Sequence, residues 1–290
     1  IARRQRQMCI RDSDYTSQLY TCLSNASYKN DYKKNIVILS PGVFNSAYFE
    51  HAYLAQQMGI DLVESSDLFL SKDNFVYMKT INGKKKVDVI YRRVNDNYLD
   101  PKVWVKDSIL GVPGIVNSWK EKKVAIVNAP GSGVADDKAV YAFVPGMIEY
   151  YLGEKPKLKQ VKTYLCAFEK DMKYVLENIH KLVLKPVNES GGYGILIGPQ
   201  ATKKELKEYK SKIISNPRNF VAQPLIKLST TPTLINTSIQ PRHIDLRPFI
   251  LSGNKTFITN GGLTRVALKK GSTIVNSSQG GGSKDTWVVS

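Results

Sequence analysis

The sequence predicts an α/β unit followed by an α+β unit, and three observations support this prediction. Short apolar runs alternate with a helical segment over residues 31–127, as is typical of strand–helix–strand units. The second half instead combines helical segments with closely spaced strands and polar turns, which indicates antiparallel pairing. The chain has 290 residues, 42% of them hydrophobic, which is enough to bury the core of each unit.

In the first unit, a helix is expected over residues 46–58, because Gly59 is a helix stop signal. A type I′ turn is expected at Asn82-Gly83, the central pair of a hairpin. The expected strands share a short apolar run bounded by turn residues, and they cover residues 36–39, 61–64, 75–80, 86–90 and 124–127.

In the second half, helical spacing of apolar residues predicts helices over 174–180 and 203–214. Polar turns at 252–255 and 269–272 indicate hairpins. The expected strands cover residues 182–186, 220–223, 244–251, 256–258, 263–267 and 273–275.

The chain is strongly basic, with 42 Lys and Arg against 25 Asp and Glu, a net charge of +17. This excess suits nucleic acid, an anionic membrane surface or a phosphate-bearing ligand, and equally an ordinary solvated lysine-rich surface. Three cysteines form no disulfide framework, and with three histidines they offer no zinc spacing. A reducing, cytoplasmic compartment is therefore expected. The sequence contains no run of about 20 apolar residues, so no membrane helix is expected.

Three segments could serve a nucleotide. Lys185 ends an apolar strand and is followed by a Ser-Gly-Gly-Tyr-Gly loop at 190–194, whose backbone N–H groups could approach phosphates. Lys138 lies near the start of an expected helix, and residues 220–226 form a strand with a proline-stiffened break that could face a flat heterocycle. The alternatives are a glycine-rich hairpin turn, an exposed lysine and an edge strand.

In this order, the three segments resemble the ATP-grasp ligases, and longer strings resemble the circularly permuted ATP-grasp type 2 family. The strings that carry the resemblance are SPGVFNSAYFEHAYLAQQMG (40–59), YRRVNDNYLDP (91–101), NAPGSGVADDKAVY (128–141), KPVNESGGYG (185–194), RHIDLRPFIL (242–251) and GGLTRVALKKGSTIVNSSQGGGSKDTWV (261–288). The resemblance implies an ATP-grasp fold, with a Rossmann-like pre-ATP-grasp domain over 35–127 and an ATP-grasp domain over 128–290. An ATP-lid subdomain would cover about 150–226.

The resemblance also implies roles for individual residues. The ATP-binding residues would be Lys138, Lys185, Ser190, Gly191, Gly192, Tyr193, Gly194, Gln223, Pro224, Leu225 and Ile226. The catalytic residues at the transferred phosphoryl group would be Arg247, Arg265 and Asn276. Candidates for the acceptor side are Tyr48, Glu50, Arg92, Arg93 and Asp96, although the two arginines could instead be interdomain salt-bridge partners and Tyr48 a core residue.

The magnesium ligands depart from the family pattern. ATP-grasp enzymes hold Mg²⁺ with an acidic residue and a Glu-x-Asn motif, and no such motif follows Gly282. We therefore expect an N-terminally truncated member, with residues 1–12 a non-native leader and 13–34 the end of an upstream region that carries the ligands. Asp245 is the acidic residue of the 242–251 strand that could approach the metal.

These features predict an ATP-dependent carboxylate–amine (or thiol) ligase that forms peptide or amide bonds through an acyl phosphate. Its cofactors would be ATP and Mg²⁺, its substrates a small carboxylic acid and an amine or peptide, and no membrane is involved. One alternative is a nucleotide-binding fragment without turnover. The other is a basic nucleic-acid-binding protein, which is less favoured because the 16 tyrosines are evenly spread and no RNA-recognition signature is present.

Overall fold

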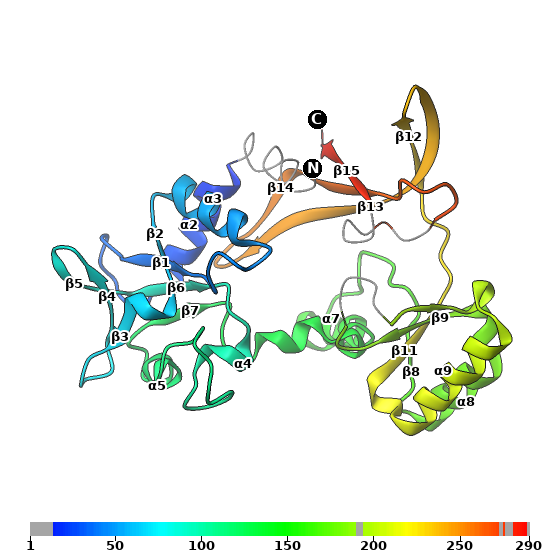
Figure 1. Cartoon of the computed structure of the whole chain (residues 1–290), viewed down its shortest axis with the longest axis horizontal. Coiled ribbons are helices and arrows are strands. Elements are labelled where there is room, and N and C mark those ends of the chain that lie inside the picture. The colour runs from blue at the N-terminus through cyan, green and yellow to red at the C-terminus, as the bar shows by residue number, and fades with distance from the viewer. Residues whose placement is uncertain (1–13, 190–193, 273–274, 276–280, 289–290) are drawn as a thin grey trace. The chain divides into compact units, whose positions relative to one another are not determined.

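The computed structural model describes residues 14–189, 194–272, 275 and 281–288 of the chain (Figure 1). These residues fall into two compact units. The first takes its described residues from Ile1–Gly133, Leu246–Thr264 and Ser283–Ser290, and the second from Val134–Asp245 and Arg265–Gly282.

A parallel four-stranded sheet forms the centre of the first unit. Its strands, in the order β2-β1-β6-β7, are β2 (Asp61–Val63), β1 (Ile36–Leu39), β6 (Val89–Arg92) and β7 (Ala125–Val127). All four residues of β1 are buried, which explains its unbroken apolar sequence, because a strand covered on both faces has no polar side. The α/β prediction for this part of the chain is confirmed.

Alternate residues of β1 pack on opposite faces of this sheet. Ile36 and Ile38 share a core cluster with α2 (Tyr15–Asn25) and α3 (Tyr48–Met58), the latter ended by Gly59 in the left-handed region at φ 64°. Val37 and Leu39 pack in a second cluster that includes α5 (Ile115–Lys120). The remaining helix of this part, α4, spans Asp96–Leu99.

The expected hairpin is present, but two details of its prediction are wrong. Strands β3 (Leu68–Leu70), β4 (Val76–Thr80) and β5 (Gly83–Lys86) form an antiparallel sheet, and Thr80 pairs with Gly83, so the two-residue loop is Ile81-Asn82. The expected strand 86–90 is divided, because β5 ends at Lys86 and β6 pairs with β1 in the other sheet. Nothing in the sequence of residues 86–90 marks the point at which the chain passes from one sheet to the other.

The second unit contains an antiparallel sheet in the order β10-β9-β11-β8, flanked by helices. The apolar sides of α8 and α9 share a core cluster with this sheet, and a capping box of Thr202 and Glu205 begins α9. The elements are α6 (Lys138–Tyr141), α7 (Val144–Leu152), β8 (Tyr164–Leu165), α8 (Glu169–Asn178), β9 (Leu182–Pro186), β10 (Leu196–Ile197), α9 (Lys203–Ser215) and β11 (Phe220–Pro224). Short 3₁₀ turns occur in both units, at Ser65–Asp67 in the first unit, at Ser132–Asp136 where the two units meet in sequence, and at Ile179–Lys181, Gly198–Gln200 and Pro217–Asn219 in the second.

A further sheet, in the order β12-β13-β14-β15, contains long strands that contribute residues to both units. These strands are β12 (Thr230–Ile235), β13 (Ser238–Ser252), β14 (Thr256–Val266) and β15 (Gly282–Trp287). The expected strands 256–258 and 263–267 are one strand, because Gly261 and Gly262 do not interrupt it. A Cβ at Gly262 would lie 2.7 Å from the Arg247 carbonyl oxygen, so glycine permits close strand approach there. Most of the expected strand 273–275 lies outside the described residues.

Among the described residues, no helix has the length and apolar character needed to span a membrane. The mixed parallel and antiparallel sheets confirm the α/β plus α+β class. The domain boundaries at 35–127, 128–290 and about 150–226 stay a prediction.

Candidate functional site

Two lysines that the sequence predicts to bind phosphate lie together in the second unit. Lys185 projects from β9, and Lys138 begins α6. The Lys138 amide donates to the Val187 carbonyl at 3.1 Å, and the Lys138 ammonium donates to the carbonyls of Val187, at 3.3 Å, and of Glu189. These contacts join the start of α6 to the chain just after β9, where the charge of Lys138 acts on Lys185.

The electrostatics of this pair favour an anion. Burial lowers the pKa of Lys138, partly opposed by Glu189, and burial followed by the charge of Lys138 lowers the pKa of Lys185. Within the described ranges, neither ammonium forms an ion pair with a carboxylate. A phosphate beside both would offset their mutual repulsion and their desolvation.

A hydrogen-bonded chain fixes the position of the Lys185 ammonium. Lys185 Nζ donates to Gln223 Oε1 at 2.7 Å, and Gln223 Nε2 donates to Thr163 Oγ1 at 2.8 Å. Gln223, the first residue of the expected adenine segment, therefore also contacts Lys185 through its side chain. Thr163 was missed by the sequence analysis, because an isolated threonine 60 residues from its partner carries no local signal.

Asp137 supports the start of α6. Its carboxylate caps the helix by accepting from the Ala139 amide at 2.8 Å, and it accepts from Arg218 Nη2 at 2.7 Å. Burial acts to raise the pKa of Asp137, but the hydrogen bonds from Arg218 and Ala139 outweigh it and lower the pKa. Asp137 and Arg218 thus hold the turn that carries Lys138.

The glycine loop is described only at its last residue, since Ser190–Tyr193 lie outside the described residues. Gly194 has φ 68°, and a Cβ there would lie 2.8 Å from Pro186 Cγ, so the position favours glycine on two grounds. The Tyr209 hydroxyl donates to the Gly194 carbonyl at 2.6 Å. The end of the loop is therefore attached to α9.

The expected adenine segment crosses the end of β11. Gln223 and Pro224 still pair with β9, whereas Leu225 and Ile226 lie beyond the last paired residue. Leu225 is 39% and Ile226 47% exposed. The backbone of these two residues lies outside the ladder, as contact with a heterocycle would require.

The expected phosphoryl-side residues lie on the long strands. Arg265 Nε donates to Asp245 Oδ1 at 2.8 Å, and Arg265 Nη2 also contacts this carboxylate, so the two side chains form a forked ion pair. Arg247 is exposed on β13, in the first unit. Asn276 lies outside the described residues. Asp245, the acidic residue that could approach the metal, is therefore paired with the guanidinium of Arg265.

The carboxyl edge of the parallel sheet forms a second candidate region. In this sheet β2 lies on one side of β1 and β6 on the other, so the strand order reverses direction between β1 and β6. Open α/β sheets bind ligands at the carboxyl ends of the strands at such a switch point. Ser40 follows β1, and its hydroxyl lies 3.0 Å from Nδ1 of the buried His51. Arg93 follows β6, and its amide donates to the Leu39 carbonyl at 2.8 Å.

One acceptor-side candidate of α3, Glu50, contacts Arg93 at this edge. Arg93 Nη2 donates to Glu50 Oε1 at 2.6 Å, and Nη1 donates to the Tyr91 hydroxyl at 3.0 Å. Tyr48 is the first residue of α3 and is partly buried. Glu50 and Arg93 therefore come together, while Ser40 and His51 join this edge without having been predicted.

Arg92 and Asp96 instead brace the segment after β7. Arg92 donates to the carbonyls of Asn128 and Ala129 at 2.6 and 3.1 Å, and pairs with Asp96 at 2.7 Å. Asp96 Oδ1 accepts from the Gly131 amide at 3.2 Å. The ion pair of Arg92 therefore lies within the first unit and is not the expected interdomain salt bridge.

The described residues contain no cluster of three His, Cys, Asp or Glu side chains that could hold a metal ion.

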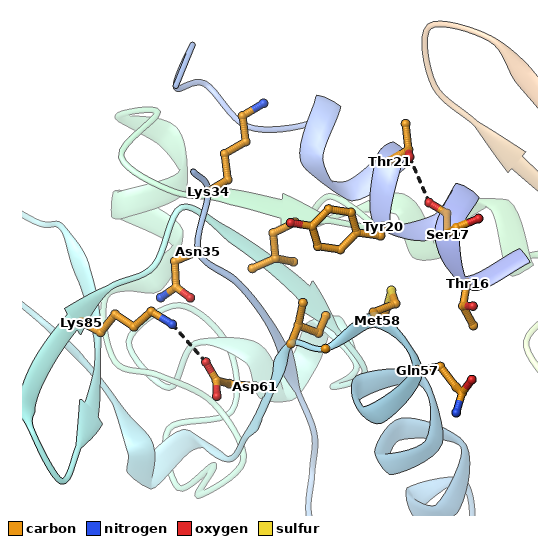
Figure 2. A pocket seen from close by; sticks show the side chains of 13 residues that line it. Thr16, Ser17, Tyr20, Thr21, Lys34, Asn35, Gln57, Met58, Asp61 and Lys85 are labelled. Carbon is orange, nitrogen blue, oxygen red and sulfur yellow. Dashed lines mark hydrogen bonds and ion pairs between the residues drawn. The ribbon is translucent and has the colours of Figure 1, made fainter. Parts of the chain in front are cut away.

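A cavity of about 490 Å³ also lies in the first unit, lined by α2, the end of α3 and the residues just before β1 and β2. Figure 2 shows the Lys85–Asp61 ion pair, 3.4 Å long, on one side and Thr16 and Gln57 on the other. Because it lies at the amino ends of β1 and β2, it contains none of the predicted site residues.

The fold is shared with a solved structure. The structure resembles that of a glutathione synthetase-like effector from Globodera pallida in the apo form, with a TM-score of 0.53, 14% identity and coverage of 95% of this chain and 60% of the other. This likeness, together with the mixed sheets, identifies the ATP-grasp fold.

The particular family follows from the sequence match. Residues 3–267 match the model of the circularly permuted ATP-grasp type 2 family, and the chain belongs to that family. The predicted resemblance is thereby confirmed.

Two relatives illustrate the range of the family. An uncharacterized protein of Synechocystis is 52% identical over 95% of this chain and 57% of its own length. A protein of Frankia casuarinae, named "Putative glutamate–cysteine ligase 2-2", is 43% identical over 87% of this chain and 29% of its own. The chain spans about half the length of the first curated relatives it matches.

Proposed function

We propose that this protein is an ATP-dependent ligase that joins a small carboxylic acid to an amine, peptide or thiol. The observation that supports this most directly is the partly buried pair of Lys138 and Lys185, which interact electrostatically and form no ion pair with a carboxylate among the described residues. When bound, ATP supplies the phosphoryl group that converts the carboxylate into an acyl phosphate. The amine or thiol then attacks the acyl carbon, and phosphate leaves.

In this proposal the second unit binds the nucleotide. Lys138 and Lys185 hold its phosphates, and the side chain of Gln223 keeps Lys185 in place. The backbone of Leu225 and Ile226 faces the adenine, and the loop 190–194 covers the phosphates. The protein's contribution is positioning and charge stabilisation.

The proposed phosphoryl side comprises Arg247, Arg265 and Asn276. Arg265 would give up part of its forked contact with Asp245 and bind the transferred phosphoryl group instead. The planar guanidinium can donate two hydrogen bonds to the phosphoryl oxygens. We propose Mg²⁺ as the second cofactor, with its main ligands outside the described residues and Asp245 as a further candidate.

The acceptor side is proposed for the first unit, as a Rossmann-like pre-ATP-grasp domain. The switch point between β1 and β6 supports this, because Glu50 and Arg93 meet there with Tyr48 at the start of the same helix. The name of the Frankia relative makes glutamate and cysteine the first substrates to test. A cytoplasmic location is part of the same proposal.

The test is ATP affinity, measured by calorimetry on the wild-type chain and on Lys185→Met. A charged hydrogen bond contributes about 1.5–3 kcal/mol, so Lys185→Met should weaken ATP binding by a factor of about 10 to 150. Lys207→Met is the matched control, since Lys207 is an exposed residue of α9 in the same unit. Equal affinities for all three proteins would refute the assignment.

Turnover separates the ligase from a nucleotide-binding chain without activity. Release of phosphate from ATP with Mg²⁺, glutamate and cysteine should exceed the release without the amino acids. Tight ATP binding without any such release, across a panel of carboxylic acids and amines, would favour the inactive alternative.

A further inference from the structure

A second cluster of lysines lies in the first unit, and none of its members belongs to the sites described above. It surrounds a pocket of about 240 Å³. Three separate segments supply its charged residues, namely the turn after α2, the end of β5 with the residues that follow, and the turn between α5 and β7. The residues that carry the argument are Lys29, Phe75, Lys86, Asp88, Lys122 and Lys123.

Two of these lysines lie against one aromatic ring. Lys86 Nζ is 3.9 Å and Lys123 Nζ 4.6 Å from the centroid of the Phe75 ring. These two distances place the ammonium nitrogens no more than about 8.5 Å apart, which is close to the Debye length of about 8 Å at physiological ionic strength. Salt therefore screens their repulsion only in part.

The charges around the pocket do not balance. Asp88 is buried and accepts from the Asn35 amide at 2.9 Å, and Lys29 pairs with Asp31 at 3.0 Å. Over the described ranges, no carboxylate forms an ion pair with the other three lysines, Lys86, Lys122 and Lys123. The pocket therefore keeps an excess of positive charge.

The turn that carries Lys122 adds a local observation. Lys122 has φ 56°, and its amide donates to the Trp119 carbonyl at 3.0 Å at the end of α5. Glycine is the usual residue at such a left-handed position, because a side chain there is sterically unfavourable. A residue that breaks a local preference in this way is a candidate for a functional role.

We infer that this pocket binds a compact polyanion of the phosphate class, held by Lys86, Lys122 and Lys123 beside the Phe75 ring. Each ammonium group can donate a charge-assisted hydrogen bond of about 2.8 Å to a phosphate oxygen, and pyrophosphate, with oxygens on two phosphorus atoms, reaches farther than orthophosphate. The pocket volume suits orthophosphate or pyrophosphate, and Asp88 limits the charge that it accepts. The inference does not depend on the proposed ligase activity.

The test is calorimetric titration with pyrophosphate, and then orthophosphate, at constant ionic strength. The double variant Lys86→Gln/Lys123→Gln should lose at least tenfold in pyrophosphate affinity. The matched control is Lys84→Gln, because Lys84 lies on the same strand and is also placed over a ring, that of Tyr77, at 4.9 Å. Its affinity should stay within twofold of the wild type.

Two further variants separate this pocket from a folding defect and from the proposed nucleotide site. Lys122→Gly relieves the left-handed strain, so it should keep or raise the melting temperature while weakening pyrophosphate binding. In Lys138→Gln/Lys185→Gln, which alters the proposed nucleotide site, pyrophosphate binding to the pocket should persist. If the pyrophosphate binding that remains in Lys138→Gln/Lys185→Gln also survives the addition of Lys86→Gln/Lys123→Gln, or if binding disappears with the nucleotide-site lysines alone, the inference is wrong.

A nucleic acid is the competing occupant, and the same proteins test it. If a random single-stranded DNA oligonucleotide binds, is released by Lys86→Gln/Lys123→Gln, and pyrophosphate shows no binding, the pocket belongs to an extended nucleic-acid surface. That result would overturn the assignment to a compact anion.

Discussion

Protonation of His51 should destabilise the first unit. His51 is 1% exposed, and its Nδ1 lies 3.0 Å from the Ser40 hydroxyl, which in turn accepts from the Gly42 amide at 3.2 Å. Burial, and next the charge of Arg93, lower the pKa of His51 from 6.5 to about 4. The imidazole is therefore neutral at pH 7.

The sign follows from the two pKa values. Between pH 6.5 and about 4 the unfolded chain binds a proton at this position and the folded chain does not, so stability falls as the pH falls. The full difference between the two pKa values corresponds to about 3 kcal/mol, and about 2 kcal/mol of it is already lost at pH 5 relative to pH 8.

Urea denaturation followed by circular dichroism at pH 8 and pH 5 measures this loss. The comparison protein is His51→Asn, which keeps a polar atom toward Ser40 but does not titrate. The wild type should lose about 2 kcal/mol more than His51→Asn between the two pH values. The difference isolates His51 from the other groups that titrate in this range.

Direct titration provides an independent check. The chain has three histidines, so the ring signals of the wild type are few and can be assigned by NMR with His51→Asn as the reference. A titration midpoint of His51 near 6.5, or an equal loss of stability in both proteins, would refute the reasoning.

Three further predictions concern a buried carboxylate, a close backbone approach and the lysine pair. Asp100→Asn should lower the free energy of unfolding by about 1–3 kcal/mol, measured in urea, because the buried carboxylate accepts from three backbone amides and an amide side chain cannot replace all of these contacts. Gly198→Ala should lower the melting temperature, since a Cβ there would lie 2.0 Å from the Ile179 carbonyl oxygen; an unchanged value would contradict this close approach. ATP binding at alkaline pH should take up protons, because the pKa values of Lys138 and Lys185 are lowered in the free protein and a bound phosphate favours their charged forms. Calorimetry in buffers of different ionisation enthalpy measures this uptake. Equal heats in all buffers would count against it.

The local sequence pattern predicted those helices and strands that lie in a single sheet or pack with one apolar side. Residues 36–39 are apolar throughout because both faces of β1 are covered, and residues 182–186 and 203–214 match β9 and most of α9. The prediction was wrong where one extended run serves two sheets, at Lys86 to Ile90. It also divided β14 at Gly261-Gly262, because a glycine pair usually signals a break but here allows another backbone to approach.

The sequence pointed to the candidate residues themselves but not to the atoms that they contact. The motifs around Lys138, Lys185 and Gln223 are long and specific, so the sequence identified these residues as candidates. Their contacts are with atoms that no motif contains, such as the Val187 carbonyl and the Thr163 hydroxyl. Those partners are recruited by strand pairing and helix packing across many intervening residues.

By itself, the sequence determined which segments are extended or helical, where a lysine precedes a glycine loop, and how basic the chain is, because these properties depend on neighbouring residues. Only the tertiary structure decided that Lys138 lies beside Lys185, and that Lys86 and Lys123 share the ring of Phe75. Both arrangements depend on contacts between segments far apart in the chain. The physical consequence, like charges that act on one another, exists only after folding has paired those segments.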